Sequence, residues 1–370
     1  MTGKKVALVH DYIKEYGGAE RVLEQLHEMY PQAPVFTLVY APQFLGPHKE
    51  RFKDWDIRPS FLQLIPFSYK FISLYRIIAP LVFKTFRFAG FDIILVSATG
   101  AYSPNSINKQ SAKQLCYYHT PPRYLYGYAT ARQKSTNPIL RALTEVMLHI
   151  LRIVDYYSSK NVDVCIANSE NVARRIEKAY RRKSVVVYPP VAVPAIQLQQ
   201  VHKNYFLAGG RLARPKHIDL IVKTCSELNV PLKVFGKSFA GYGEEVKQVA
   251  GSSVEFLGEV SDEQRNELMR SAKAFIFAAE DEDFGIVPVE AMAQGTPVIA
   301  FASGGVLETV VDGKTGVLFE ALTVESLKKA IKKFESLKIS SHACYNQAKR
   351  FSRETFHKQI EKLIYYARIT

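Results

Sequence analysis

Short apolar runs alternate with stretches of helical spacing along nearly the whole chain. In the first half, runs rich in Val, Ile, Leu and aromatic residues occupy 6–10, 34–39, 92–98, 114–119, 162–169 and 184–190. A second set occupies 205–212, 231–236, 253–258, 274–279 and 296–301. Strands that are apolar throughout and separated by helices are typical of parallel sheets covered on both faces. The pattern therefore predicts an α/β protein with two open parallel sheets.

The stretch 189–202, PPVAVPAIQLQQVH, is poor in charge and interrupted by prolines, as expected of a linker. We therefore expect one Rossmann-like domain over 1–190 and a second over 203–351, facing each other across a cleft. In such sheets, ligands bind beyond the carboxyl ends of the strands. The tail, 352–370, has helical spacing with one apolar face made by Phe356, Ile360, Leu363 and Ile364.

Charge is unevenly distributed between the two halves. Residues 1–200 carry 26 Lys and Arg against 14 Asp and Glu, a net of +12 out of the total of +14. A negatively charged partner should therefore meet the first half, and nucleic acid and an anionic membrane surface both fit this property.

Cysteine usage and the start of the chain indicate a cytoplasmic protein. Cys116, Cys165, Cys225 and Cys344 have no metal-binding spacing, so we interpret them as reduced core thiols. The first residues run directly into a strand pattern without a secretory signal, and no run of about 18 uncharged apolar residues predicts a membrane span.

Two glycine pairs follow predicted strands and are candidates for phosphate binding. Gly17-Gly18 follows the first strand and precedes a helix, whose free N–H groups favour an anion. In LAGGRLARPKHIDLIV (207–222), Arg211 and Lys216 follow a double glycine at the mouth of a helix, which suits a diphosphate. A glycine turn and a solvated basic loop are the purely structural alternatives.

The stretch EDEDFGIVPVEAMAQG (280–295) places two glutamates around a tight, glycine-containing loop. Pro288 fits the first turn of a helix, so Glu282 lies in the loop and Glu290 on the helix. Carboxylates at both places can accept hydrogen bonds from sugar hydroxyls, while amides near Gly285 and Ile286 face a phosphate. Acids that complement a helix dipole explain one glutamate, but not the whole pattern. Asp281-x-Asp283 and Asp54-x-Asp56 are common by chance, and we predict no metal site.

Four motifs in this order resemble those of retaining glycosyltransferases of family 4. They are GGAER, GGRLxxxK, the Glu-x7-Glu stretch, and EAMAQGTPVIA followed by GGVLETVVDGKTG. The resemblance covers most of the chain and is strongest over 205–320. HDYIKEYGGAERV and YYHTPPRYLY look most like bacterial mannosyltransferases of O-antigen and exopolysaccharide synthesis. The family resemblance implies the GT-B fold, in which residues 352–370 cross back onto the first domain. Retention of anomeric configuration and independence of metals or other cofactors are also implied.

The resemblance also implies roles for individual residues. Arg211 and Lys216 are expected to neutralise the donor diphosphate, and Glu290 to hold the ribose diol. Glu282 is expected to contact the transferred sugar, and His119 to lie near it. The remaining expected donor contacts are Gly17 and Gly18 from the first domain, and Val260, Asp262, Phe284, Gly285 and Ile286 from the second.

The expected donor is GDP-mannose, because a carboxylate at Asp262 can accept from guanine N1–H and its amino group, which uracil lacks. Ser261 and Gln264 equally fit a helix capping box, in which Asp262 is only a first-turn acid. A UDP-sugar transferase or an epimerase is the close alternative.

Residues 61–90 combine aromatic and aliphatic residues with Lys70, Arg76, Lys84 and Arg87 and contain no acid. They predict interfacial helices on the anionic inner face of the cytoplasmic membrane, where a lipid-linked glycan acceptor could be met. A buried helix pair with snorkelling cations is the alternative. No nucleic-acid motif accompanies the basic charge, so the different-class alternative, a nucleic-acid-binding protein, is not favoured.

Overall fold

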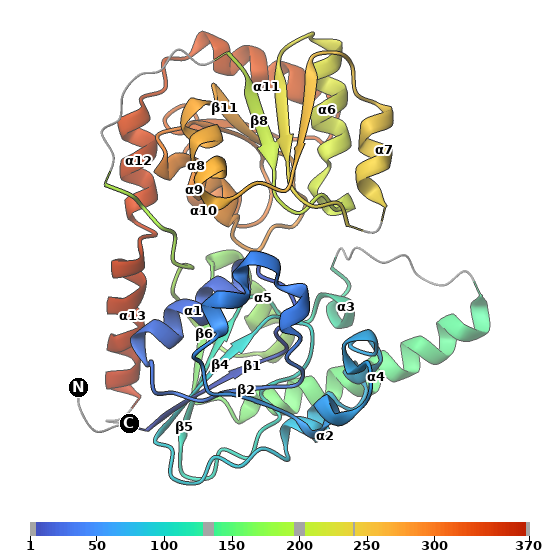
Figure 1. The fold of residues 1–370 in the computed structure, drawn as a ribbon, viewed down its shortest axis with the longest axis vertical. Helices are drawn as coiled ribbons and strands as arrows, with labels where there is room; N and C mark the ends of the chain where they lie inside the picture. The colour runs from blue at the N-terminus through green and yellow to red at the C-terminus, as the bar shows by residue number, and fades with distance from the viewer. Residues whose placement is uncertain (1–4, 129–136, 196–203, 240, 368–370) are drawn as a thin grey trace. The chain divides into compact units, whose positions relative to one another are not determined.

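The computed structural model describes residues 5–128, 137–195, 204–239 and 241–367. It divides into two units (Figure 1). The first holds the described residues of Met1–Tyr128, Arg132–Pro190 and Phe356–Thr370, and the second those of Val191–Thr355. Part of the predicted linker, 196–202, lies outside the described residues.

The first unit is built on a seven-stranded sheet in which all paired neighbours are parallel. Its spatial order is β3-β2-β1-β4-β5-β6-β7. The strands are β1 Val6–His10, β2 Val35–Thr37, β3 Ile57–Pro59, β4 Ile93–Ala98, β5 Lys113–Tyr118, β6 Val164–Ala167 and β7 Val185–Val186. The order reverses direction between β1 and β4, and such a switch point is where α/β sheets bind ligands.

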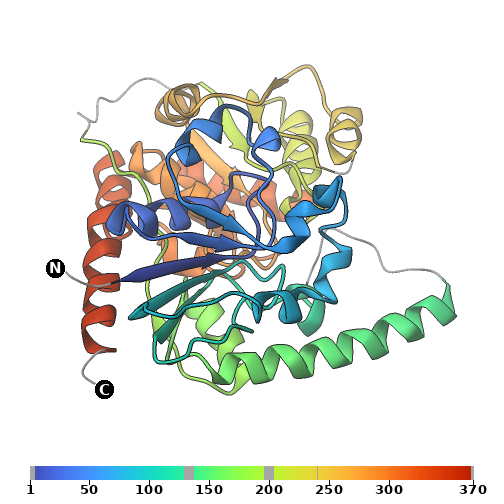
Figure 2. The ribbon, with the colours of Figure 1, turned by 60° about the horizontal axis from the view of Figure 1, so that its bottom comes forward.

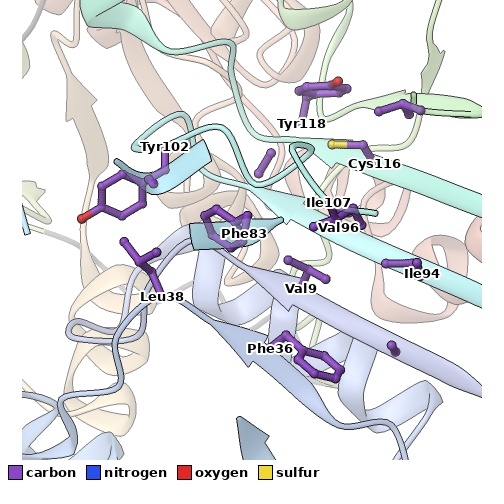
Figure 3. Packing of buried hydrophobic residues seen from close by; sticks show 14 of the residues in the cluster. Val9, Phe36, Leu38, Phe83, Ile94, Val96, Tyr102, Ile107, Cys116 and Tyr118 are labelled. Carbon is purple, nitrogen blue, oxygen red and sulfur yellow. The ribbon is translucent and has the colours of Figure 1, made fainter. Parts of the chain in front are cut away.

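Alternate residues of these strands feed two hydrophobic clusters, one on each face of the sheet. Val9, Ile94 and Cys116 point to one face and pack with Phe36 and Phe83, as Figure 3 shows. The helices of this unit are α1 Gly18–Met29, α2 Ala79–Phe83, α3 Arg123–Tyr126, α4 Pro138–Lys160 and α5 Glu170–Tyr180, with short 3₁₀ turns η1 Pro42–Phe44 and η2 Gly46–Phe52.

The C-terminal helix, α13 (Arg353–Tyr366), packs on the first sheet although it follows the second unit in sequence. Phe356, Ile360 and Ile364 are buried against the cluster that also contains the α1 residues Leu23 and Leu26. The side chain of His357 also meets Gln25, with 3.0 Å between Nε2 and Oε1. The predicted return of the tail to the first domain is confirmed.

The second unit has a six-stranded parallel sheet in the order β10-β9-β8-β11-β12-β13. Its strands are β8 Phe206–Gly209, β9 Leu232–Phe235, β10 Val254–Gly258, β11 Ala274–Phe277, β12 Val298–Phe301 and β13 Gly316–Phe319. Its helices are η6 Arg214–Lys216, α6 Ile218–Glu227, α7 Tyr242–Gln248, α8 Asp262–Ser271, α9 Ile286–Ala293, α10 Val306–Thr309, α11 Val324–Ser336 and α12 Ser341–Lys349. The predicted fold, two Rossmann-like parallel sheets, is confirmed.

Two strands were not predicted from the pattern, and both lie at or near a sheet edge. β3 has three residues and ends in Pro59, and β13 follows the turn around Gly313. β3 has only Ile57 beside Arg58 and Pro59, which is too few apolar residues to stand out as a run. β13 is as long as several of the predicted strands and was missed.

The prediction of interfacial helices over 61–90 is wrong for most of the segment. It forms three 3₁₀ turns, η3 Phe61–Leu64, η4 Ser68–Lys70 and η5 Leu74–Arg76, followed by the five-residue α2. Pro66 disfavours a helical residue before it, and Phe67 adopts a left-handed conformation (φ 55°), so no long helix can form. A buried helix pair is equally wrong, because nine large apolar side chains of the segment are exposed.

All four cysteines are buried, as expected of core residues. Within the described residues, no helix has the length and apolar character needed to cross a bilayer.

Candidate functional site

In the second unit, the predicted phosphate-binding loop lies at the carboxyl end of β8. Gly210 has φ +115°, and a Cβ on Gly236, at the end of β9, would lie 1.8 Å from the Gly210 carbonyl oxygen. The two strand ends therefore approach so closely that glycine is required there. Arg211 follows directly, is exposed, and has its guanidinium 5.8 Å from the centroid of the Phe239 ring.

Lys216 and Glu282 are brought into contact, although 66 positions separate them in sequence. Lys216 ends η6 and Glu282 lies in the loop after β11, and their side chains form a direct ion pair. The loop is tied to η6 by the N–H of Glu280, which donates to the carbonyl oxygen of Pro215 at 2.9 Å. Both paired side chains remain about a quarter exposed, at 27% and 22%. A ligand bound here therefore meets a cation and a carboxylate side by side.

The loop around Phe284 contacts a third glycine pair, Gly304-Gly305, which begins the GGVLETVVDGKTG motif but was given no role of its own from the sequence. The N–H of Gly305 donates to the carbonyl oxygen of Glu282 at 2.8 Å. A Cβ on Gly304 would lie 2.1 Å from that same oxygen. Phe284 is buried, with its ring centroid 5.3 Å from that of Phe351, and this packing anchors the loop.

The start of α9 matches the prediction closely. Gly285 precedes the helix with φ +86°, Ile286 is its first residue, and Pro288 lies in its first turn. The N–H groups of a first helical turn have no partner within the helix, so this end can receive an anion. Glu290 lies one turn further along the helix.

Glu290 and Asp262 are joined by Arg265, a residue that the motifs did not reveal. Arg265 lies 3.4 Å from Glu290 Oε1 through one guanidinium nitrogen and 2.9 Å from Asp262 Oδ1 through another. Both Glu290 and Arg265 are largely buried, with 11% and 17% of their side chains exposed. The predicted ribose-binding and base-reading carboxylates thus belong to one charged cluster.

The capping box predicted at the start of α8 is present. Ser261 Oγ accepts from the N–H of Gln264 at 3.1 Å, and Gln264 Oε1 accepts from the N–H of Ser261 at 3.0 Å. It fixes the helix start that carries Asp262. Val260 precedes it and is partly exposed. A base-reading role for Val260 and Asp262 stays a prediction.

In the first unit, three side chains at the carboxyl ends of β1, β4 and β5 form a hydrogen-bonded row. The parallel register places His10 beside Ser97. Ser97 Oγ lies 3.1 Å from His10 Nδ1 and 3.0 Å from His119 Nε2. Burial, with a smaller contribution from His10, lowers the pKa of His119 to about 3. His119 is therefore neutral at physiological pH.

The predicted Gly17-Gly18 motif begins α1 and connects to this row. The N–H of Gly17 donates to Glu20 Oε2 at 2.8 Å, and Glu20 Oε1 lies 3.6 Å from His10 Nε2. The structure thus links Gly17 and His119 through side chains of the same unit. His10, Ser97 and Glu20 were not predicted; the strand order, which places β4 between β1 and β5, is the information that the sequence pattern lacked.

Two family descriptions together match residues 16–351. "Glycosyltransferase Family 4" matches residues 16–193, and "Glycosyl transferases group 1" matches residues 193–351. The chain belongs to glycosyltransferase family 4. The resemblance inferred from the four motifs is thereby confirmed, and the protein is a hexosyltransferase.

Curated relatives and solved structures agree with the family. The chain is 24% identical to the alpha-1,3/1,6-mannosyltransferase ALG2 of Rhizomucor pusillus, over 74% of this chain and 70% of the relative. It is 26% identical to human ALG2, over 74% and 73%. Among solved structures, Anabaena HepE in complex with UDP and glucose has a TM-score of 0.69 at 19% identity, covering 98% of this chain and 99% of that one. Sucrose-phosphate synthase from Thermosynechococcus elongatus has a TM-score of 0.73 at 18% identity, with the same coverage. At these identities, the structural likeness shows the GT-B fold.

Proposed function

We propose that this glycosyltransferase moves mannose from GDP-mannose, with retention and without a metal ion, onto a lipid-linked or oligosaccharide acceptor of bacterial surface polysaccharide. Mannose is supported by the relatives named as mannosyltransferases. The observation that carries the donor assignment is the cluster of Glu290, Arg265 and Asp262, in which carboxylates suited to a ribose diol and to guanine are joined by one arginine.

The second unit offers the groups needed to hold the donor. Arg211 and Lys216 supply positive charge for the diphosphate, with the amides of Phe284, Gly285 and Ile286 beside it. Because Lys216 contacts Glu282, a phosphate at the lysine places the attached sugar next to the glutamate. Glu282 then accepts hydrogen bonds from sugar hydroxyls, and Glu290 from the ribose diol.

The chemical step needs no protein nucleophile. Negative charge grows on the leaving diphosphate as the bond from its oxygen to the sugar breaks, and positive charge grows on the sugar ring. Arg211 and Lys216 stabilise the first, and Glu282 the second, because fixed charges need no reorganisation at that moment. The acceptor hydroxyl attacks from the face of the leaving group and gives its proton to a donor phosphate oxygen.

Calorimetry with GDP, GDP-mannose, UDP and UDP-glucose, without metal and then with Mg²⁺, tests the donor. We expect metal-independent binding of GDP and its weakening by Glu290→Gln, with Glu263→Gln on the exposed side of α8 as the matched control. Stronger binding of UDP would support a UDP-sugar transferase or epimerase instead. Release of free sugar in the absence of any acceptor would single out the epimerase.

The proposed site of action is an anionic membrane surface, contacted by the first unit. Two exposed apolar parts of that unit carry this proposal, and we call them the turn segment (61–81) and the α4 stripe. Large apolar side chains of the turn segment are 39–85% exposed: Phe61, Leu64, Ile65, Phe67, Phe71, Leu74, Ile77, Ile78 and Leu81. Lys70 and, just beyond the segment, Lys84 and Arg87 are exposed too, and 61–90 contains no acid. Exposed apolar side chains with cations in the same stretch suit binding to anionic lipid.

The α4 stripe is another exposed apolar surface of the first unit, and the sequence pattern did not reveal it. Ile139, Leu143, Val146, Ile150, Ile153 and Tyr157 recur at intervals of four and three residues and are 44–71% exposed. One side of the helix is therefore apolar and uncovered. Figure 2 shows the N-terminal half of α4, green at the bottom, extending beyond the rest of the first unit.

Pelleting with vesicles tests the membrane proposal. We expect the protein to bind vesicles of phosphatidylglycerol and phosphatidylcholine, and binding to be lost in a variant carrying Leu64→Ser, Leu74→Ser and Ile150→Ser. Val249→Ser, at a 42% exposed valine of the second unit, is the control. Salt-sensitive retention of DNA with no vesicle binding would contradict the proposal.

A further inference from the structure

We propose that Glu20, acting through His10 and Ser97, fixes His119 in the tautomer with its proton on Nε2, which leaves Nδ1 as a hydrogen-bond acceptor for a sugar hydroxyl. Glu20, His10 and Ser97 are positioning residues in this scheme. The inference rests on the proposed function and on the expectation, from the family resemblance, that His119 lies near the transferred sugar.

The row of contacts has only a few consistent proton arrangements. Ser97 has one hydroxyl proton and touches a ring nitrogen of each histidine, His10 Nδ1 and His119 Nε2. A neutral imidazole carries one N–H and one bare nitrogen. In the first arrangement, His119 Nε2–H donates to Ser97, whose hydroxyl donates to His10 Nδ1, and His10 Nε2–H faces Glu20. In the second, His10 Nδ1–H donates to Ser97, whose hydroxyl donates to His119 Nε2, and His10 Nε2 faces Glu20 without a proton. In the third, both rings donate to Ser97, and His10 Nε2 is again bare.

Glu20 selects the first arrangement. Its Oε1 is 3.6 Å from His10 Nε2, a buried nitrogen with no shorter polar contact among the described residues. A bare nitrogen facing a carboxylate is repelled, whereas an N–H is attracted. Glu20 is the first-turn acid of α1, and its Oε2 accepts from the N–H of Gly17 at 2.8 Å while Oε1 faces His10. The proton of His10 therefore lies on Nε2, which makes Nδ1 the acceptor from Ser97.

Asp11 is another charged group next to the row, and one of its two oxygens is engaged by backbone groups. Asp11 Oδ2 accepts from the backbone N–H groups of Thr99 at 2.8 Å and Ala101 at 3.3 Å. The ring of Tyr117 contacts His119 edge-on at 5.1 Å and holds its plane. Burial keeps His119 neutral, since its pKa is lowered to about 3. The side chain is therefore suited to accept a hydrogen bond from a hydroxyl, not to act as a cation for phosphate.

The tautomer can be observed directly in the full-length protein labelled with ¹⁵N-histidine. The chemical shifts of ring nitrogens distinguish a protonated nitrogen from a bare one, and His119→Gln identifies the signals of His119. We expect a protonated Nε2 and a bare Nδ1 in the wild type, and a mixture of tautomers in Glu20→Gln, whose amide can face His10 with either atom. A protonated Nδ1 in the wild type overturns the inference.

Kinetics test whether the tautomer matters. Ser97→Ala should lower kcat about tenfold, the value of one hydrogen bond to a hydroxyl, with a smaller effect on KM, and Ser97→Thr should restore most of it. Ser158→Ala is the control, because it removes another buried serine hydroxyl of the same unit, bonded to the carbonyl oxygen of Asp155. Equal losses in Ser97→Ala and Ser158→Ala overturn the positioning role. If GDP-mannose is not the donor, the NMR result is unaffected, so failure of the proposed function is recognised separately.

Discussion

Replacing Gly304 by alanine tests how strictly the donor loop is positioned. Gly304 has φ +63°, and an added Cβ would lie 2.1 Å from the carbonyl oxygen of Glu282. Real Cβ contacts are essentially never shorter than 3.0 Å, so the backbone at Glu282 has to move by about 0.9 Å. That backbone cannot give way as a flexible side chain could, because its carbonyl also accepts the hydrogen bond from Gly305.

The cost has two parts that a control separates. An alanine at positive φ costs about 1 kcal/mol, and overpacking adds about 1–3 kcal/mol. Gly313→Ala has the first cost without the second, since Gly313 has φ +72° and nothing within 4 Å of its added Cβ. We therefore expect Gly304→Ala to be less stable than Gly313→Ala by about 1–3 kcal/mol.

The functional loss should be larger than the loss of stability. A displacement near 1 Å at a site that positions reacting groups costs up to about 100-fold in rate. We expect Gly304→Ala to lose roughly that factor in kcat/KM for sugar transfer, and Gly313→Ala to remain close to wild type. Urea unfolding and initial rates measure the two quantities. Equal stability and equal rates in the two variants would falsify the account of the loop.

Further predictions concern single side chains in both units. Arg211→Ala should lower kcat at saturating donor without changing stability, because the guanidinium is exposed; unchanged turnover contradicts its role. Ser261→Ala should cost about 1 kcal/mol by removing the N-cap of α8, read from the urea midpoint, and no loss contradicts the importance of the capping box. Asp155→Ala should destabilise the first unit by about 2–4 kcal/mol, because the buried carboxylate accepts from Ser103, Tyr126 and Tyr180, whose hydroxyls lose their partner. Burial raises the pKa of Asp155 from 3.8 to about 6, so the folded protein binds a proton here more readily than the unfolded chain does. The contribution of this group to the free energy of unfolding therefore rises as pH falls from 6 toward 4. Asp155→Asn should remove this pH dependence, and an unchanged profile contradicts the assignment.

Much of the fold follows from periodicity alone. Eleven of the strands appear as apolar runs because parallel strands are covered on both faces and need apolar residues at every position. β3 escapes this signal because it has only Ile57 beside Arg58 and Pro59. The turn segment was misjudged because its apolar residues suggested a long helix, which cannot run through Pro66. The α4 stripe was also missed, since an apolar helix face has the same spacing whether it is buried or exposed.

In the candidate site, too, some residues could be predicted from the sequence and others could not. The sequence reveals the glycine pairs, Arg211, Lys216, Glu282 and Glu290. Each lies in a short motif that contains a strand end, the loop after it and the start of the next helix. The contact of Arg265 with Glu290 and the row from Glu20 through His10 and Ser97 to His119 are not revealed, since each joins residues of separate elements. The sequence by itself determined the two parallel sheets and the loops that carry the chemistry, because both depend on local pattern. Only the tertiary structure decided which of those loops meet, because strand order and register set the contacts between residues far apart in the chain.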